Sequence, residues 1–520
     1  AGAEIRGEKA EGIFEKRYGY DPVTGNSAMP VPKDPGNGEG FKYSDLVSYA
    51  NAMDQLSGQE IEENRFASFY GALDYSLFDR YVLNVSFRTD GSNNFGSDEQ
   101  FNPTWSAGAV WHVSEETFME VVRPVLSRLS LRVATGYTGN INKTVKPNLM
   151  MKYYKNFRIS DDENYRMGYI NNAPNPKLRW EKTRDVKVAL DFGLWKDRIN
   201  GIVEAYWRKS KDCVTSEYVP VTTGFFNQSY NTSVLQNNGV EFSLSVAVLK
   251  SKDYNLSVSA NVAWNQNKLK KYNSPNTSLA LDKYVGYPMG AVFSGKYEGI
   301  DPETGMYKFK LRPDAVTNKD GYLREPNNYY YYLGTSVAPF TGGFNLSFSY
   351  KNIGLSVGGS YSVKAKMVDN IESPAGYELL SGSKLESIPT PHNDLYRNHL
   401  NVKREVRNRW TPENRTGVKY PRLIDAYGKK LGLDLTNPTL TTITRGALLE
   451  DISYLRINTI ALSYSLPQRV LERINFSSAA LNLTLNNFFT ITKYSGIDPE
   501  VPGATYPVSR SVTIGLNVGF

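Results

Sequence analysis

The sequence predicts an all-β protein, a transmembrane antiparallel β-barrel to which this chain contributes about thirteen strands. Segments of alternating apolar and polar residues recur along most of the chain, and no second set of strands offers a face against which their polar sides could pack. Successive side chains of a strand point to opposite faces, so each segment has one apolar and one polar face. A wall with lipid on one side and water on the other accounts for both faces.

The last segment of the chain shows this alternation plainly. Val512, Ile514 and Leu516 fall on one side of the strand, whereas Thr513 and Gly515 fall on the other. The same pattern recurs in three other segments, at 254–266, 344–350 and 480–488. These segments have close to the ten residues that a tilted membrane strand requires.

The full set of expected strands covers most of the chain. In the strand that contains Leu455, the apolar set changes register between Ile457 and Ile460, which predicts a β-bulge at that point. The expected strands are 66–78, 80–89, 104–113, 127–139, 185–195, 200–211, 240–249, 254–266, 344–350, 353–363, 454–466, 480–488 and the final segment.

The connections between these strands alternate in length. Tiny turns are expected at 78–79, 196–199, 250–253 and 351–352, and long loops rich in Asn, Gly, Pro and Tyr at 140–183, 213–238, 270–340 and 370–449. Short turns at one edge and long loops at the other are typical of an outer-membrane barrel, in which the long loops face the cell exterior. A soluble sandwich or propeller does not sort its loops in this way.

Strand parity predicts how the chain is organised. If Phe520 lies at the periplasmic side, counting back makes the first expected strand run inward. Residues 1–64 are therefore expected to be an extracellular loop region that follows an outward strand, and residues 65–520 the C-terminal part of a transmembrane barrel. We expect this part to belong to a larger barrel, because bare strand edges in lipid cost several kcal/mol per unpaired polar group.

Composition narrows the possible functions. The 36 Tyr, 23 Phe and 7 Trp residues suit membrane interfaces and surfaces that bind sugars or peptides. A net charge of +7 is mild for 520 residues, so a nucleic-acid partner is not expected. The single cysteine, Cys213, excludes an internal disulfide, and His112, His392 and His399 lack metal-site spacing, so no metal or other cofactor is expected.

Several segments resemble one family in the order in which they occur. DRYVLNVSFRTDGSNNFG (79–96), TWSAGAVWHVSEETF (104–118), NPKLRWEKT (175–183) and ISYLRINTIALSYSLP (452–467) are similar to segments of SusC/RagA-type TonB-dependent outer-membrane transporters. The resemblance spans roughly residues 65 to 520. It implies a barrel of about 22 strands closed around a folded plug, so the remaining strands, the plug and the TonB-contacting segment would lie outside this chain. It also implies a bacterial outer-membrane location amid lipid, a SusD-like lipoprotein lid, and energy supplied through TonB.

Two aromatic clusters in the long loops are candidate ligand contacts. Tyrosine rings beside amide side chains suit a sugar ring or a peptide backbone, each of which offers both apolar faces and hydrogen-bonding groups. The alternative for both clusters is loop packing or contact with the lid protein. The candidates are Tyr329, Tyr330, Tyr331 and Tyr332 in one loop, and Phe225, Phe226 and Tyr230 in another.

The leading functional hypothesis is energised import of a bulky oligosaccharide or peptide, with Arg88, Arg132 and Asp191 lining the passage as wall. One alternative is an outer-membrane barrel hydrolase with its site in the loops, which would depend on His392 or His399. Another is an adhesin or receptor that binds its ligand without transporting it. No pattern in the sequence singles out a catalytic triad, so we expect that the chain is not an enzyme.

Overall fold

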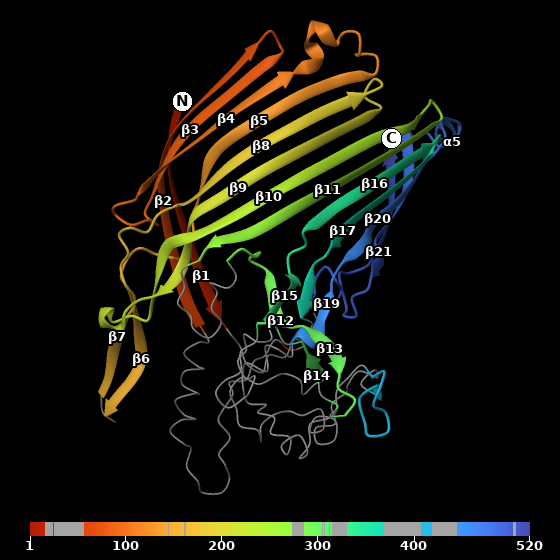
Figure 1. Ribbon diagram of the computed structural model, residues 1–520. Coiled ribbons are helices and arrows are strands. Elements are labelled where there is room, and N and C mark those ends of the chain that lie inside the picture. Colours follow the sequence, from red (N-terminus) through yellow and green to blue (C-terminus); the bar gives the residue numbers. More distant parts are fainter. Residues whose placement is uncertain are drawn as a thin grey trace.

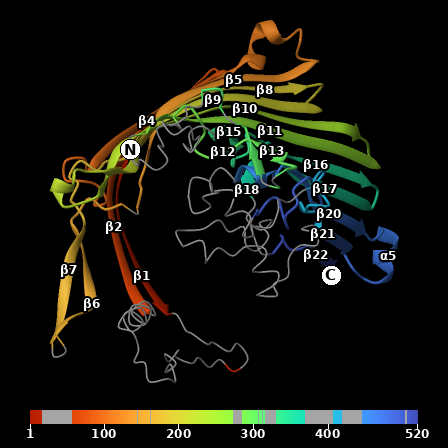
Figure 2. The same cartoon turned by 60° about the horizontal axis from the view of Figure 1, so that its bottom comes forward.

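The protein is dominated by one large curved sheet. The computed structural model describes residues 1–15, 24, 57–143, 145–160, 163–272, 285–303, 305, 307–310, 312–314, 330–368, 407–418, 445–502 and 506–520. Fourteen antiparallel strands form a single sheet that bends into an open trough (Figure 1; Figure 2). Its edges are β1 and β22, and these two strands do not pair with each other in the described part of the chain. The barrel is therefore open in this chain.

Each strand of the sheet is hydrogen-bonded to the next one along the wall. In spatial order they are β1 (Gly2–Glu15), β2 (Ser57–Leu77), β3 (Tyr81–Ser92), β4 (Phe101–His112), β5 (Leu126–Asn140), β8 (Glu181–Leu194), β9 (Ile199–Tyr218), β10 (Asn227–Lys250), β11 (Tyr254–Lys271), β16 (Phe340–Tyr350), β17 (Ile353–Val363), β20 (Tyr454–Ser465), β21 (Ser478–Thr492) and β22 (Ser511–Gly519). Among the described residues, no helix has the length and apolar character needed to cross a bilayer.

The sheet contains every strand expected from the sequence and one more, β1. Residues 2–15, which we expected within a loop region at 1–64, pair with β2 along their whole length. Alternation alone could not reveal this strand, because Lys9 and Glu11 lie on the same face as Ile5 and Ile13. We expected an outward strand before residues 1–64. β1 runs outward, antiparallel to β2, and it lies within residues 1–64.

The two edges of the sheet carry connections of different length, as predicted. Tight turns join strand pairs at one edge, where Phe78 and Asp79 both have φ of 55°, the left-handed conformation that two-residue hairpin turns require. The helix α5 (Gln468–Arg473) lies at this edge, and so does the C-terminal end of the chain (Figure 1).

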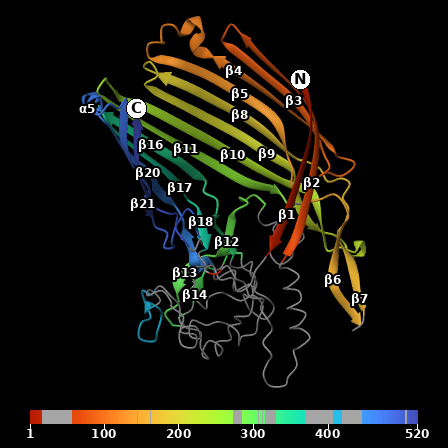
Figure 3. The same ribbon diagram turned by 180° about the vertical axis from the view of Figure 1, so that it is seen from behind.

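The opposite edge carries the longer connections and four small two-stranded sheets. The hairpin β6–β7 projects beyond this edge, whereas the other small sheets lie near the ends of β11, β16 and β17 (Figure 3). Their strands are β6 (Met150–Ser160) with β7 (Glu163–Asn172), β12 (Ala291–Gly295) with β15 (Tyr330–Thr335), β13 (Tyr297–Ile300) with β14 (Tyr307–Phe309), and β18 (Lys366–Val368) with β19 (Leu449–Asp451).

The prediction of a long loop at 213–238 is wrong. β9 continues to Tyr218 and β10 begins at Asn227, so most of this segment is strand. The extension has polar residues on both faces, and the two-sided alternation that reveals a membrane strand is therefore lost there.

The two faces of the wall differ as the alternation predicts. Leu190, Leu481, Ile514 and Leu516 are exposed on the apolar face, at 40%, 47%, 73% and 67%. On β20 the pairing skips Asn458, so the bulge predicted between Ile457 and Ile460 is confirmed. The bulge keeps apolar residues on the same face at both ends of this strand.

An arginine introduced on this apolar face should be costly. Leu483 lies near the middle of β21, opposite Leu462 and Ile514. We expect Leu483→Arg to lower the free energy of unfolding of the whole barrel by about 2–4 kcal/mol, because a cation at the bilayer midplane must be desolvated. The neighbouring Thr484→Arg on the wet face should cost far less. Denaturant unfolding in lipid vesicles measures both, and equal losses would contradict this assignment of faces.

Candidate ligand-binding site

Charged residues on the inner face of the wall are paired with one another. Arg132 and Asp191 form two contacts, Nε–Oδ2 at 2.7 Å and Nη2–Oδ1 at 3.1 Å. Arg208 donates two hydrogen bonds to Asp185, at 2.8 and 3.2 Å. Arg88 donates to Asp90 at 2.6 Å. The residues that we expected to line a passage thus lie on the inner wall, where each is held by a partner.

One part of the inner face is lined mainly by neutral side chains. A shallow groove of about 480 Å³ crosses β9, β10, β11, β16 and β17. Its polar lining consists mainly of serine and asparagine, with Arg128 as its only charged side chain. This part of the wall therefore offers weak, interchangeable hydrogen bonds rather than a fixed charge.

A deeper pocket lies at the rim, where β11 is longer than its neighbour. β16 pairs with β11 only as far as Trp264. Beyond Trp264, part of the connection between β11 and β12 lies beside β11 in place of β16. There Leu269 N–H donates to the Tyr287 carbonyl at 2.8 Å and Gly286 N–H donates to the Leu269 carbonyl at 2.7 Å. The resulting pocket has a volume of about 490 Å³. It is lined by Asn237, Trp264, Asn265, Gln266, Asn267, Tyr287, Met289 and Tyr332, among others.

Tyr287 and Tyr332 line one side of this rim pocket, and the Phe293 ring packs against both of them. Tyr287 lies 4.9 Å from Tyr332 and 5.0 Å from Phe293 between ring centroids. Tyr332 nevertheless remains 41% exposed, so part of its ring is free to stack on a ligand. Burial raises the pKa of the Tyr332 hydroxyl, which therefore stays protonated as a hydrogen-bond donor at neutral pH.

Amide side chains form the facing part of the rim pocket. Asn267 donates to the Asn237 side chain at 2.7 Å and accepts from Met289 N–H at 2.8 Å. Tyr206 donates to Asn265 at 3.1 Å. These amides are fixed in orientation before any ligand arrives, which lowers the entropic cost of binding. Aromatic faces beside fixed amides can bind a sugar ring or a peptide segment.

The structure separates the predicted site residues. Tyr332 lines the rim pocket, while Tyr331 lies opposite Ser294 and Tyr330 opposite Gly295 in the β12–β15 pairing. Tyr329 lies outside the described residues.

The second predicted cluster lies elsewhere on the rim. Phe226 is 77% exposed in the β9–β10 connection, and Tyr230 donates to Gln228 at 2.7 Å. Phe225, in the same connection, is half-buried. This connection lies beside β6–β7, away from β15 (Figure 1), so the two aromatic clusters do not form one site.

Sequence reasoning missed Tyr287, Asn237 and Asn267. They come from three separate segments, and the rim pocket exists only because β11 extends past β16. Gly286 has φ of 94°, a conformation that favours glycine. A glycine beside a tyrosine in a long loop was the one local signal for this turn.

The segments that carry the family resemblance form the best-packed part of the rim. Phe95 and Trp180 are 5% and 7% exposed, and their rings stack at 4.5 Å. Next to them, Asn94 donates to Asn64 at 2.7 Å and accepts from Lys146 at 2.9 Å. These motifs therefore hold the rim together rather than form a cavity for a ligand.

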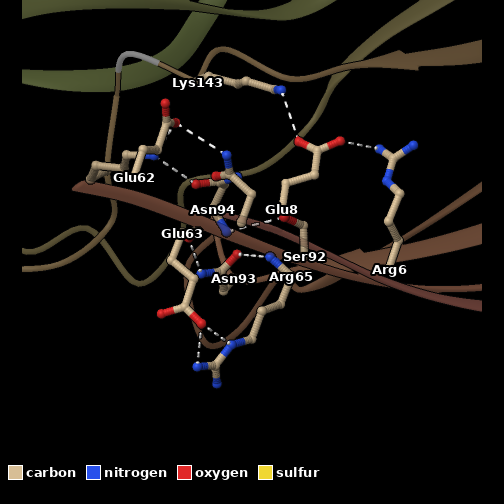
Figure 4. Close-up of polar contacts among 11 residues, drawn as sticks. Arg6, Glu8, Glu62, Glu63, Arg65, Ser92, Asn93, Asn94 and Lys143 are labelled. Carbon is tan, nitrogen blue, oxygen red and sulfur yellow. Dashed lines mark hydrogen bonds and ion pairs between the residues drawn. The ribbon is translucent and has the colours of Figure 1, made fainter. Parts of the chain in front are cut away.

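A polar network ties the ends of β1 and β2 to the neighbouring loops. Figure 4 shows Lys143 reaching Glu8, with the two charged atoms 3.5 Å apart, and Glu8 in turn pairing with Arg6 at 3.2 Å. In the same view the Asn93 side chain accepts from Arg65 N–H at 2.9 Å. The network therefore connects β1 and β2, at the open side of the trough, to the neighbouring loops of the long-loop edge.

Comparison with known proteins gives a consistent result. Residues 14–377 match the family model described as "TonB dependent receptor-like, beta-barrel". SusC of Bacteroides thetaiotaomicron, a TonB-dependent receptor, is 27% identical over 488 residues, covering 88% of this chain and 44% of that protein. TonB-dependent receptor P26 of Formosa agariphila is 26% identical over 498 residues, covering 88% and 46%.

A solved structure described as the RagAB peptide transporter superposes with a TM-score of 0.71. It is 25% identical, and the match covers 90% of this chain and 49% of that one. The chain thus spans about half the length of the relatives that it matches.

Proposed function

Because this chain belongs to the TonB-dependent receptor-like β-barrel family, we propose that it is part of an active transporter importing an oligosaccharide or a peptide. It is an outer-membrane protein, as that family is. In the proposed transporter a SusD-like lipoprotein covers the long-loop edge, and TonB supplies energy through parts of the protein outside this chain. The rim pocket makes an early contact with the cargo as it enters.

The rim pocket is the observation that carries this proposal. It combines an exposed tyrosine face with fixed amides at the edge from which cargo would enter. Its only charged lining residue is Lys268, which suits neutral sugars and peptide backbones better than anionic cargo. A similar solved structure supports transport, since it is described as a peptide transporter.

Removing the exposed tyrosine of the rim pocket should weaken uptake. We expect Tyr332→Ala to reduce uptake at limiting cargo concentration by about fivefold to a hundredfold, because stacking contacts of this kind contribute about 1–3 kcal/mol. Uptake of labelled oligosaccharides and peptides by cells carrying the full-length protein measures the effect. Tyr330→Ala is the matched control, because it alters the same strand without lining the pocket.

The same assay separates the alternatives. Binding at the cell surface without accumulation would identify a receptor or adhesin and contradict import. Release of cleaved cargo by the purified full-length protein would indicate a hydrolase. His392 and His399, on which that alternative depends, lie outside the described residues. The names of the relatives favour transport or reception over hydrolysis.

A further inference from the structure

We propose that the outer face of β8 and β9 binds the phosphate group of a phosphorylated glycolipid in the outer leaflet. The site is a cluster of basic side chains on the apolar side of the wall, just beyond its apolar band. This inference depends on the fold and on the outer-membrane location, and is independent of the cargo proposed above. The cluster, called here the basic row, comprises Lys182, Arg184, Lys209 and Lys211.

Strand register places the basic row on the lipid-facing side. On β8, Arg184 shares a face with Val188 and Leu190, and the pairing with β9 has no irregularity. Lys209 on β9 shares that face with Trp207, which is 49% exposed. Side chains two residues apart on a regular strand point the same way. The basic row therefore continues the apolar face and is separate from the trough.

The row lies across two neighbouring strands. Arg184 on β8 pairs with Lys209 on β9. Lys182 pairs with Lys211 in the adjacent row. Directly opposed residues lie about 5 Å apart, and like charges at that spacing destabilise a sheet. A bound anion would relieve this repulsion.

Other cations on the same strands have carboxylate partners. Lys187 and Arg208, on the inner face of β8 and β9, are paired with Glu204 and Asp185. Within the described residues, no ion pair involves a member of the basic row. Glu204 and Asp185 lie on the trough side of β8 and β9, on the face opposite to the basic row.

The height of the row matches a lipid headgroup. Arg184 lies ten residues before Leu194, the last residue of β8, which is about 33 Å along a strand and about 25 Å along the membrane normal at a tilt of about 40°. An apolar band of an outer-membrane barrel is about 25 Å tall. Trp207 and Tyr137 lie at this level and form its aromatic border. Phosphate groups of the outer leaflet lie just beyond such a border.

The choice of ligand follows from this position and chemistry. Basic side chains at a membrane surface bind anionic headgroups, at about 1 kcal/mol each. Arginine and lysine both make charge-assisted hydrogen bonds to phosphate oxygens. The long-loop edge faces the cell exterior, where the leaflet is built of phosphorylated glycolipid. Free phosphate could satisfy the same charges, but it would not require the neighbouring apolar band.

The test uses the full-length protein purified in detergent. It is mixed with a phosphorylated lipid A or with the same glycolipid after enzymatic removal of phosphate, and retained lipid is measured by native mass spectrometry. We expect the protein to retain the phosphorylated glycolipid and not to retain the dephosphorylated one. Replacing four members together, as Lys182→Gln, Arg184→Gln, Lys209→Gln and Lys211→Gln, should weaken binding on the order of a thousandfold.

The matched control is Lys9→Gln with Arg65→Gln. These two residues lie on the same outer face of β1 and β2, but each is already paired with its own glutamate. Binding should be unchanged in this variant. A variant in which the three lysines are replaced by arginine should retain the lipid and shows whether charge is what matters, even if the glutamine variant is poorly folded.

Three results would overturn the proposal. The first is equal retention of both glycolipids by the wild-type protein. The second is unchanged retention in the glutamine variant, with folding verified by its thermal transition. The third is complete displacement of the glycolipid by inorganic phosphate at matched concentration, which would identify a free-phosphate site instead.

Discussion

Trp180→Ala is expected to lower the free energy of unfolding by about 3–5 kcal/mol, the usual cost of deleting a large buried aromatic side chain. Trp180 is 7% exposed and stacks on Phe95 at 4.5 Å. The packing around it is tight, since a Cβ atom added to Gly139 would lie 3.0 Å from the Trp180 ring. The cavity left by alanine could not collapse without moving β5. Denaturant unfolding of the full-length protein measures this loss.

Phe226→Ala is the matched control for Trp180→Ala. Phe226 is 77% exposed in the β9–β10 connection, so its removal should change the unfolding free energy by less than about 0.5 kcal/mol. Comparable losses in the two variants would contradict the interpretation of the rim motifs as a packed core. The comparison also separates a packing residue from a candidate ligand contact, because Phe226 was predicted from sequence to touch cargo.

The same rim core explains the spacing of its motif. Gly96 approaches the Pro176 carbonyl so closely that an added Cβ would lie 1.8 Å from that oxygen. Gly96 N–H also donates to Leu178 at 2.9 Å. Glycine is needed here for close backbone contact between the β3–β4 and β5–β8 connections. The sequence segments that most resemble the transporter family are therefore segments that build the rim.

The fold was predictable from sequence where lipid and water face each other across one strand. The alternation of β11 and β21 follows directly from that contrast, and even the bulge at Asn458 left a visible change of register. The prediction failed for β1, whose outer face carries Lys9 beside Glu11. It failed again where β9 extends to Tyr218, because strands that rise above the membrane meet water on both faces.

The site was less predictable than the fold, for a geometric reason. A run of tyrosines is visible in the sequence, and Tyr332 does line the rim pocket. Which of its partners converge depends on the length difference between β11 and β16, which no local pattern encodes. Asn267 and Tyr287 therefore could not be assigned in advance. Contact with cargo stays a prediction for every candidate, namely Tyr329, Tyr330, Tyr331, Tyr332, Phe225, Phe226 and Tyr230.

Asp498→Ala should be as damaging as the loss of Trp180, through electrostatics rather than packing. Arg456 on β20 and Asp498 in the β21–β22 connection are 2% and 5% exposed, and they form a direct ion pair. Asp498 also accepts from Glu500 N–H and Val508 N–H, both at 3.0 Å. Removing Asp498 leaves the buried Arg456 charge with only the partly exposed Glu500 as its carboxylate partner, and breaking a buried pair in this way costs about 3–5 kcal/mol.

Glu500→Gln provides the matched control for Asp498→Ala. Glu500 also pairs with Arg456, at 2.8 Å, but its side chain is 41% exposed. An exposed pair of this kind contributes less than about 1 kcal/mol. The unfolding free energy should therefore fall sharply for Asp498→Ala and little for Glu500→Gln. Equal effects would show that the Arg456–Asp498 ion pair does not stabilise the fold more than the exposed Arg456–Glu500 pair does.

The Arg456–Asp498 ion pair should also make the β21–β22 connection sensitive to acid. Burial opposes ionisation of Asp498, but the N–H groups of Val508 and Glu500 and the Arg456 guanidinium outweigh it, so the pKa lies below its ordinary value. A carboxyl whose pKa is lower in the folded state stabilises that state above its ordinary pKa of about 4, and this stabilisation is lost as pH falls through the folded value. Protease cleavage within 493–510 should accordingly rise at low pH in the wild-type protein. The Asp498→Ala variant should be cleaved readily at every pH. Cleavage of the wild-type protein that does not change with pH would contradict the role of the Asp498 carboxylate in holding this connection.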